Sequence, residues 1–126
     1  IAPAKVEGEL TIEPEISQAM TYGDKRPYLV AVLVPEQSFI EEWASSSGVE
    51  ANLTGLSENE AFGKAVGSAL ERANARLSQI EKVRRFIIAS EPFTTDNAMM
   101  TPTLKIRRHK IRETYWERLD RLYTRN

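Results

Sequence analysis

The chain has 126 residues, 41% of them hydrophobic and 28% charged, which is typical of one folded domain and unlike a disordered chain. It has no cysteine and one histidine, so disulfides, thiolate metal sites and multi-histidine metal sites are excluded. No apolar run reaches the roughly 20 residues that a membrane-spanning helix needs.

The charge is distributed unevenly along the chain, although the net charge is only -1. Residues 1–62 contain 3 basic and 11 acidic side chains, residues 63–104 contain 6 and 4, and residues 105–126 contain 8 and 3. The basic C-terminal end predicts either an anionic partner or a solvated helix face.

The first residues, IAPAKVE, contain neither a methionine nor the basic segment of a signal peptide, so we expect an excised part of a longer protein. Pro3 suits a first helical turn, and Val6 and Leu10 lie four residues apart, which predicts a helix over residues 4–12. Pro14 ends it. The runs ISQAMTYG and YLVAVLVP then flank a turn at residues 23–27, and predict a hairpin whose second strand is buried on both faces.

Helical spacing returns after this hairpin. Phe39, Ile40 and Trp43 predict a helix that ends at Gly48, and a connector follows in which Ser57 and Glu60 form a predicted capping box. A long helix is predicted next, with an apolar stripe formed by Phe62, Val66, Ala69, Leu70, Ala73 and Leu77.

The last third of the chain is predicted to hold one strand over residues 83–89, a loop, and a final helix from Ile106 to Tyr123. Ile111, Tyr115, Leu119 and Leu122 form the buried stripe of this helix. The order α-β-β-α-α-β-α predicts an α+β fold, a small domain with a three-stranded, mainly antiparallel sheet covered by helices.

Most of the usual catalytic patterns are missing. The sequence has no glycine-rich phosphate loop, and Asp24 and Asp96 stand in predicted loops without an identifiable carboxylate partner. We interpret His109 as a surface residue and Trp43 as part of the core, whereas Trp116 faces a partner surface or is half-buried.

Five cations lie within residues 105–112, which is enough to contact nucleic-acid phosphates, but no helix-turn-helix or zinc-finger pattern accompanies them. Lys105 differs from the other four because it follows Thr101-Pro102-Thr103, at the predicted junction of loop and helix. A lysine there offers a compact charge for a reacting phosphate or carboxylate, so we consider it a candidate catalytic residue.

The run TPTLKIRRHKIRETY, residues 101–115, resembles the C-terminal motif of AMP-forming acyl-CoA synthetases, a superfamily that includes luciferases and peptide-synthetase adenylation domains. Its first part is similar to the long-chain fatty acid branch. The superfamily usually has glycine before the lysine, where this chain has Leu104, and that departure is typical of the long-chain branch. Three more blocks agree in order, and the resemblance covers residues 1–126: IAPAKVEGEL (with Lys5 where glutamate is common), ISQAMTYGDKRPYLVAVLVP and LSQIEKVRRFII.

The resemblance implies the mobile C-terminal domain of a two-domain long-chain fatty acid–CoA ligase, inactive when isolated from its N-terminal adenylation domain. Such enzymes join a carboxylate to the α-phosphate of Mg-ATP and then transfer the acyl group to coenzyme A after a domain rotation. It implies that Lys105 acts in the first step. Arg72 falls where some relatives bind the 3'-phosphate of coenzyme A, with a solvated helix arginine as the other interpretation.

The rest of the machinery is expected to lie outside this chain. ATP and Mg²⁺ would be bound mainly by the N-terminal domain, and the fatty acid pocket would belong to that domain too. We expect a cytoplasmic enzyme, with peripheral membrane association as an open alternative. Two other functions stay open: a related ligase for another carboxylic acid, and a free-standing basic-helix module that binds nucleic acid.

Overall fold

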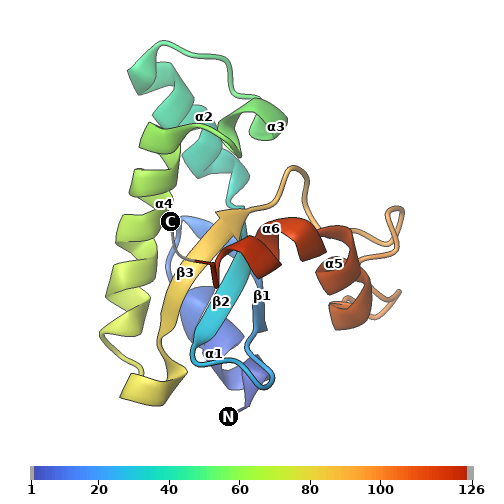
Figure 1. The fold of residues 1–126 in the computed structure, drawn as a ribbon. Helices are drawn as coiled ribbons and strands as arrows, with labels where there is room; N and C mark the ends of the chain where they lie inside the picture. Colours follow the sequence, from blue (N-terminus) through green and yellow to red (C-terminus); the bar gives the residue numbers. More distant parts are fainter. Residues whose placement is uncertain (1, 125–126) are drawn as a thin grey trace.

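A computed structural model of the protein describes residues 2–124, which form one three-stranded sheet with helices on both faces (Figure 1). The order of elements is α1 (Pro3–Leu10), β1 (Ile16–Tyr22), β2 (Leu29–Pro35), α2 (Gln37–Ser47), α3 (Leu53–Leu56), α4 (Glu60–Asn74), the 3-10 turn η1 (Gln79–Glu81), β3 (Val83–Ile88), α5 (Arg108–Thr114) and α6 (Trp116–Arg121). The predicted α+β class is confirmed.

The sheet has the order β1-β2-β3, with β2 in the centre. β1 and β2 form the predicted antiparallel hairpin, while β3 runs parallel to β2 because the chain crosses over through α2, α3 and α4 before it returns. All seven residues of β2 are buried, as a strand covered on both faces requires, and this confirms the interpretation of its continuous apolar run.

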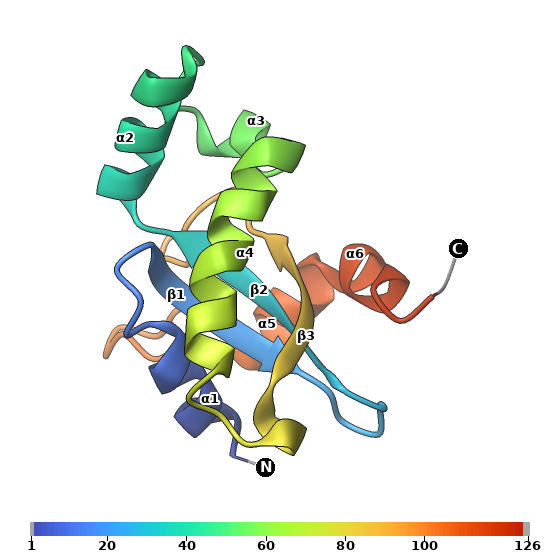
Figure 2. The same ribbon diagram turned by 90° about the vertical axis from the view of Figure 1, so that its left-hand side faces the viewer.

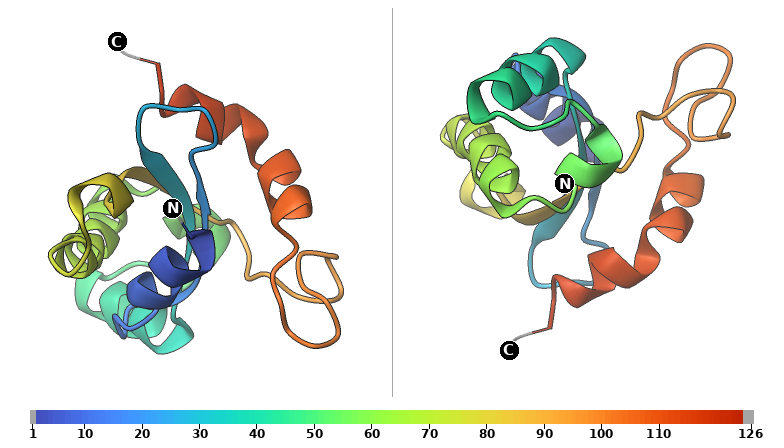
Figure 3. Two further views of the ribbon diagram at one scale, coloured as in Figure 1. Left: turned by 90° about the horizontal axis from the view of Figure 1, so that it is seen from below. Right: turned by 90° about the horizontal axis from the view of Figure 1, so that it is seen from above.

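Two hydrophobic clusters lie on opposite faces of the sheet. The first packs α1, α2 and α4 against one face, with Phe62 of α4 stacked on Phe39 and contacted edge-on by Trp43. Figure 2 shows α4 crossing this face. The second cluster packs α5, α6 and the loop before them against the other face, around Ile111 and Leu119. Figure 3 shows the two layers with the sheet between them.

Several predicted boundaries were wrong. α4 is capped by Asn59, whose side chain accepts from the Phe62 N–H, because Ser57 is already engaged in closing the unpredicted helix α3. A true capping box lies instead at η1, between Ser78 and Glu81. α4 ends at Asn74, so Leu77, the last residue of the predicted apolar stripe, lies beyond the helix although it stays buried.

The final predicted helix is two helices. It begins at Arg108 rather than at Ile106, and it breaks at Tyr115, whose backbone lies outside the α region at φ -106° and ψ 16°. Tyr115 stays buried as predicted, and its hydroxyl accepts from the backbone N–H of Ser90, which ties the helix pair to the end of β3. None of the helices described over residues 2–124 is long and apolar enough to cross a membrane.

Candidate functional site

The candidate site is the loop of residues 94–107, which leads from the end of β3 to α5 and projects away from the sheet (Figure 3). Its entry is tied to β1 by Gln18, whose side chain donates to the Phe93 carbonyl at 3.1 Å and accepts from the Phe93 N–H at 2.9 Å. Phe93 and Met99 are buried in the second cluster. These contacts fix the base of the loop.

Asn97 organises the next turn of the loop. Its side-chain oxygen accepts from the backbone N–H groups of Thr94 and Met99, and its amide donates to the Pro92 carbonyl. Arg107 closes the loop from the other side. Its backbone N–H donates to the Met99 carbonyl at 2.8 Å, and its guanidinium donates to the Ala98 carbonyl. The loop is therefore held by its own hydrogen bonds and is not a loose connection.

At the tip, residues 101–105 form a tight turn. The Thr101 N–H donates to the Lys105 carbonyl at 2.8 Å, and the Thr101 hydroxyl accepts from the Lys105 N–H at 3.1 Å. Just outside the turn, Met100 and Ile106 pair as an isolated antiparallel bridge. Ile106 is thereby committed to a bridge, which explains why α5 begins two residues later than predicted.

Leu104 occupies the left-handed position of this turn, at φ 65°. Residues other than glycine rarely adopt this backbone conformation, whereas glycine adopts it without strain. The glycine that the wider superfamily usually has before the lysine fits this backbone. The usual presence of glycine at this position was the signal from which a turn with a left-handed residue could have been predicted.

The turn presents Lys105 to solvent from a fixed backbone. Its side chain has no ion-pair or hydrogen-bond partner among residues 2–124. It lies three residues before α5, within the loop, and not directly before a helix that begins at Ile106 as predicted. The position still suits a residue that acts on another surface, since its charge is not neutralised within the described chain.

Arg108 connects the start of α5 to α1, near the N-terminal end of the chain. Its two terminal nitrogens donate to both carboxylate oxygens of Glu7 in α1, and Glu7 also accepts from the backbone N–H and hydroxyl of Thr21 in β1 at 2.7 and 3.0 Å. Glu7 is only 8% exposed. Hydrogen bonding to this carboxylate raises the pKa of Arg108 above its ordinary value.

The pairing of Arg108 corrects the interpretation of the basic run. The sequence leaves Arg107, Arg108, Lys110 and Arg112 as a helix face that is either solvated or attracts phosphate. Arg108 is instead committed to the buried carboxylate of Glu7, and Arg107 precedes the helix and braces the loop. Two arginines of the run, Arg107 and Arg108, therefore have structural contacts, whereas Lys105 and Lys110 have no ion pair in the described chain.

Arg72 lies on the other side of the sheet, on α4, where it donates to Glu13 at 2.7 Å and to Glu15 at 2.6 Å. Hydrogen bonding from Arg72, and then from Arg76, lowers the pKa of Glu13 below its ordinary value. A coenzyme A phosphate would have to compete with these two carboxylates. The role predicted for Arg72 stays a prediction.

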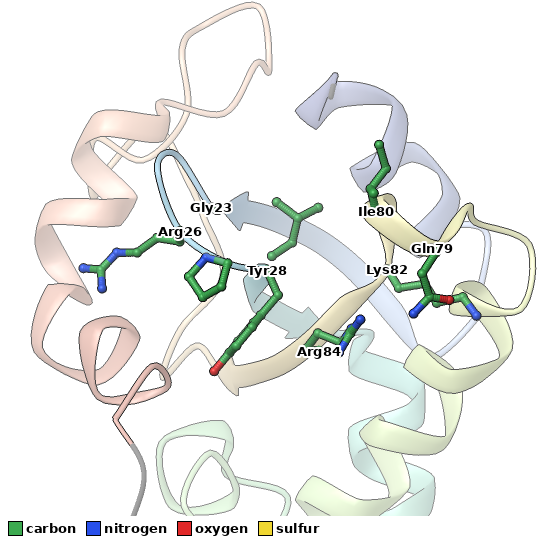
Figure 4. Close-up of a pocket in the computed structure, with 9 residues that line it drawn as sticks. Gly23, Arg26, Tyr28, Gln79, Ile80, Lys82 and Arg84 are labelled. Atoms are coloured by element: carbon green, nitrogen blue, oxygen red, sulfur yellow. The ribbon is translucent and has the colours of Figure 1, made fainter.

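A second group of cations lies at the free edge of β3. Lys82 and Arg84 line a hollow of about 330 Å³ together with Tyr28 and Ile80 (Figure 4). Arg84 is the extra residue where the register between β2 and β3 shifts, and such a bulge turns a side chain outward. Neither cation is in an ion pair within the described chain. This hollow was not predicted, because the sequence does not show which strand forms the sheet edge.

Three of the remaining candidates, His109, Trp43 and Asp24, lie where the sequence predicts. His109 is on the surface, and Trp43 packs against the core. Trp116 is exposed, at 38%, and is not half-buried; its ring centre lies 5.6 Å from that of Tyr22 and edge-on to it. Asp24 lies in a turn, and no group of three or more acidic or histidine side chains within residues 2–124 could hold a metal ion.

The family and the curated relatives agree with the loop motif. The family model of the AMP-binding enzyme C-terminal domain matches residues 1–126. The chain is 29% identical, over 127 aligned residues, to the long-chain-fatty-acid–CoA ligase FadD15 of Mycobacterium tuberculosis, covering 99% of this chain and 21% of that protein. It is also 29% identical to long-chain-fatty-acid–CoA ligase 6 of Homo sapiens, covering 98% of this chain and 18% of that protein. The chain thus spans about a fifth of the length of these relatives.

Solved structures with a similar fold include the adenylation domains of carboxylic acid reductases. The adenylation domain of the carboxylate reductase of Mycobacterium chelonae has 31% identity and a TM-score of 0.79, with 98% of this chain and 18% of that chain covered. The A-PCP didomain of carboxylic acid reductase from Segniliparus rugosus, in complex with AMP, has 32% identity and a TM-score of 0.76, with 98% and 16% covered. With the family model matching the whole chain, this protein belongs to the C-terminal domain family of AMP-binding, adenylate-forming enzymes.

Proposed function

We propose that this chain is the C-terminal domain of an ATP-dependent, AMP-forming long-chain fatty acid–CoA ligase. The observation that supports this most is the rigid turn of residues 101–105, which presents Lys105 outward with no partner in the described chain. The names of the curated relatives supply the substrate class. On this proposal the isolated chain is inactive, because the larger domain supplies the pockets for ATP and the acid.

Lys105 would act in the first half-reaction, in which a carboxylate oxygen attacks the α-phosphorus of ATP and pyrophosphate leaves. Both reactants are anionic, so a cation between them offsets their repulsion and stabilises the charge that develops on the transferred phosphate. ATP would arrive with Mg²⁺, and the larger domain would hold that ion, since residues 2–124 offer no suitable cluster of ligands.

The second half-reaction would use a different face of the domain. Lys105 precedes α5, whereas Lys82 and Arg84 lie at the edge of β3, next to α4 on the other layer (Figures 3 and 4). Both cations suit the phosphates of coenzyme A. A single fixed orientation of this domain on the larger domain could not direct both Lys105 and the Lys82–Arg84 face at the same site. This supports a rotation of the domain between the two half-reactions.

A second candidate is an adenylation domain that activates another carboxylic acid. It is favoured by the solved carboxylic acid reductase domains, whose identity of 31–32% is slightly higher than that of the curated ligases. The two candidates share the chemistry of adenylation and differ in the acid and in the thiol that accepts the acyl group.

The test is carried out on the full-length protein. ATP–pyrophosphate exchange is measured with carboxylic acids of graded chain length, followed by thioester formation with free coenzyme A. We expect exchange to be greatest with long-chain fatty acids and acyl-CoA to accumulate. Exchange without any transfer to free coenzyme A would reject the ligase and favour the second candidate.

A further inference from the structure

Leu104 is unfavourable in this domain on two counts. Its backbone is in the left-handed region at φ 65°, and its side chain is 70% exposed. A left-handed backbone conformation is a marked outlier for a bulky residue. Exposing a large apolar side chain to water is also unfavourable in free energy. Glycine would remove both defects at once.

Other residues share one of these features but not both. Ile12 and Ile80 are exposed to a similar degree, yet neither has a positive φ. Lys25 and Ala98 have a positive φ, but one side chain is charged and the other is a single methyl group. Among residues 2–124, Leu104 alone combines an exposed, large apolar side chain with a strained backbone.

The contacts of the domain do not explain the choice of leucine. The turn is held by backbone groups and by Thr101, so it would form equally well with glycine at this position. The leucine side chain is absent from both hydrophobic clusters. Strain that is retained next to a functional residue is a reason to look for a role outside the local fold.

The position of Leu104 indicates what covers it. It is adjacent to Lys105 in a rigid turn at the end of a projecting loop (Figure 3), so any surface that receives Lys105 also meets Leu104. Pro102 and Thr103, the exposed neighbours in the same turn, would meet that surface beside it. The curated relatives are about five times longer than this chain, which leaves a large partner surface within the same polypeptide.

We propose that Leu104 is a positioning residue that docks into an apolar recess of the larger adenylation domain and thereby seats Lys105 for the first half-reaction. The inference rests on the proposed function. Burying most of a leucine side chain favours the docked state about 10-fold or more. The contact would exist only while Lys105 is engaged, so it would contribute to one half-reaction and not to the other.

The test compares Leu104→Gly, Leu104→Ala and Leu104→Met in the full-length protein. We expect Gly and Ala to lower kcat/KM for acid-dependent pyrophosphate exchange about 10-fold, and Met to stay within about 2-fold because it keeps the apolar volume. Thioester formation from supplied acyl adenylate should be unchanged in all three. In the 126-residue chain, Leu104→Gly should unfold at a higher temperature than the original, which shows that lost exchange is not lost stability.

Each alternative result has a definite meaning. Exchange at the original rate in Leu104→Gly would overturn the proposal, since the leucine side chain would then be dispensable. Equal loss in both half-reactions would overturn it as well, because the contact would not be specific to adenylation. Lys105→Ala serves as the reference: if that variant also exchanges normally, the proposed function fails, and not merely the role of Leu104.

Discussion

The ion pair between Arg108 and Glu7 is predicted to hold the loop of residues 94–107 onto the body of the domain. Arg108→Met removes the guanidinium and leaves a carboxylate that is only 8% exposed without its cation. Breaking a buried pair by removing one partner costs about 3–5 kcal/mol. Here the cost is reduced, because the Arg108 side chain is 40% exposed and Glu7 keeps two hydrogen bonds from Thr21. We therefore expect a loss of about 2–3 kcal/mol.

The assay is urea unfolding of the 126-residue chain, supported by thermal unfolding, in which the loss corresponds to a fall of about 10 °C. Lys110→Met is the matched control, since it removes a positive charge from the same helix at a side chain without an ion pair in the described chain, and it should cost no more than about 0.5 kcal/mol. Adding Glu7→Gln to Arg108→Met should recover at least about 1 kcal/mol. Equal effects of Arg108→Met and Lys110→Met would refute the reasoning.

Two further predictions concern acid stability and the basic hollow. Hydrogen bonding from Lys5, and then from Ser78, lowers the pKa of Glu81 to about 2 from 4.5, so its contribution to stability is present above pH 4.5 and is lost as the pH falls toward 2. Urea unfolding at a series of pH values should show a shallower loss over this range in Glu81→Gln, and an unchanged slope would contradict the assignment. Replacing Lys82 and Arg84 together with glutamine should raise KM for coenzyme A about 10-fold and leave pyrophosphate exchange unchanged. An unchanged KM, with a raised KM in Arg72→Gln, would instead assign the phosphate contact to Arg72.

The parts of the fold that follow from local patterns could be predicted. The continuous apolar run of residues 29–35 specified a strand buried on both faces, and the stripe from Phe62 to Ala73 specified the face of α4 that packs on the sheet. In each case the side chains that decide the structure lie within one element. Their periodicity is therefore visible in the sequence.

The parts that depend on distant partners could not be predicted. Ile106 and Arg107 continue a helical pattern, yet the bridge of Ile106 to Met100 and the bonds of Arg107 to the loop keep both residues out of α5. Arg108 appeared to be one cation among five because its partner, Glu7, lies 101 residues away. The candidate lysine was identified by the motif around it, whereas the turn that presents it was not predicted.

The central claim is that Lys105 acts in adenylation and not in thioester formation. The most direct measurement compares Lys105→Ala with the matched control Lys110→Ala in the full-length protein, for acid-dependent pyrophosphate release and for thioester formation from supplied acyl adenylate. We expect Lys105→Ala to lose about 100-fold or more of pyrophosphate release while it keeps thioester formation, with little change in the control. Equal losses in both half-reactions, or no loss in either, would contradict the claim.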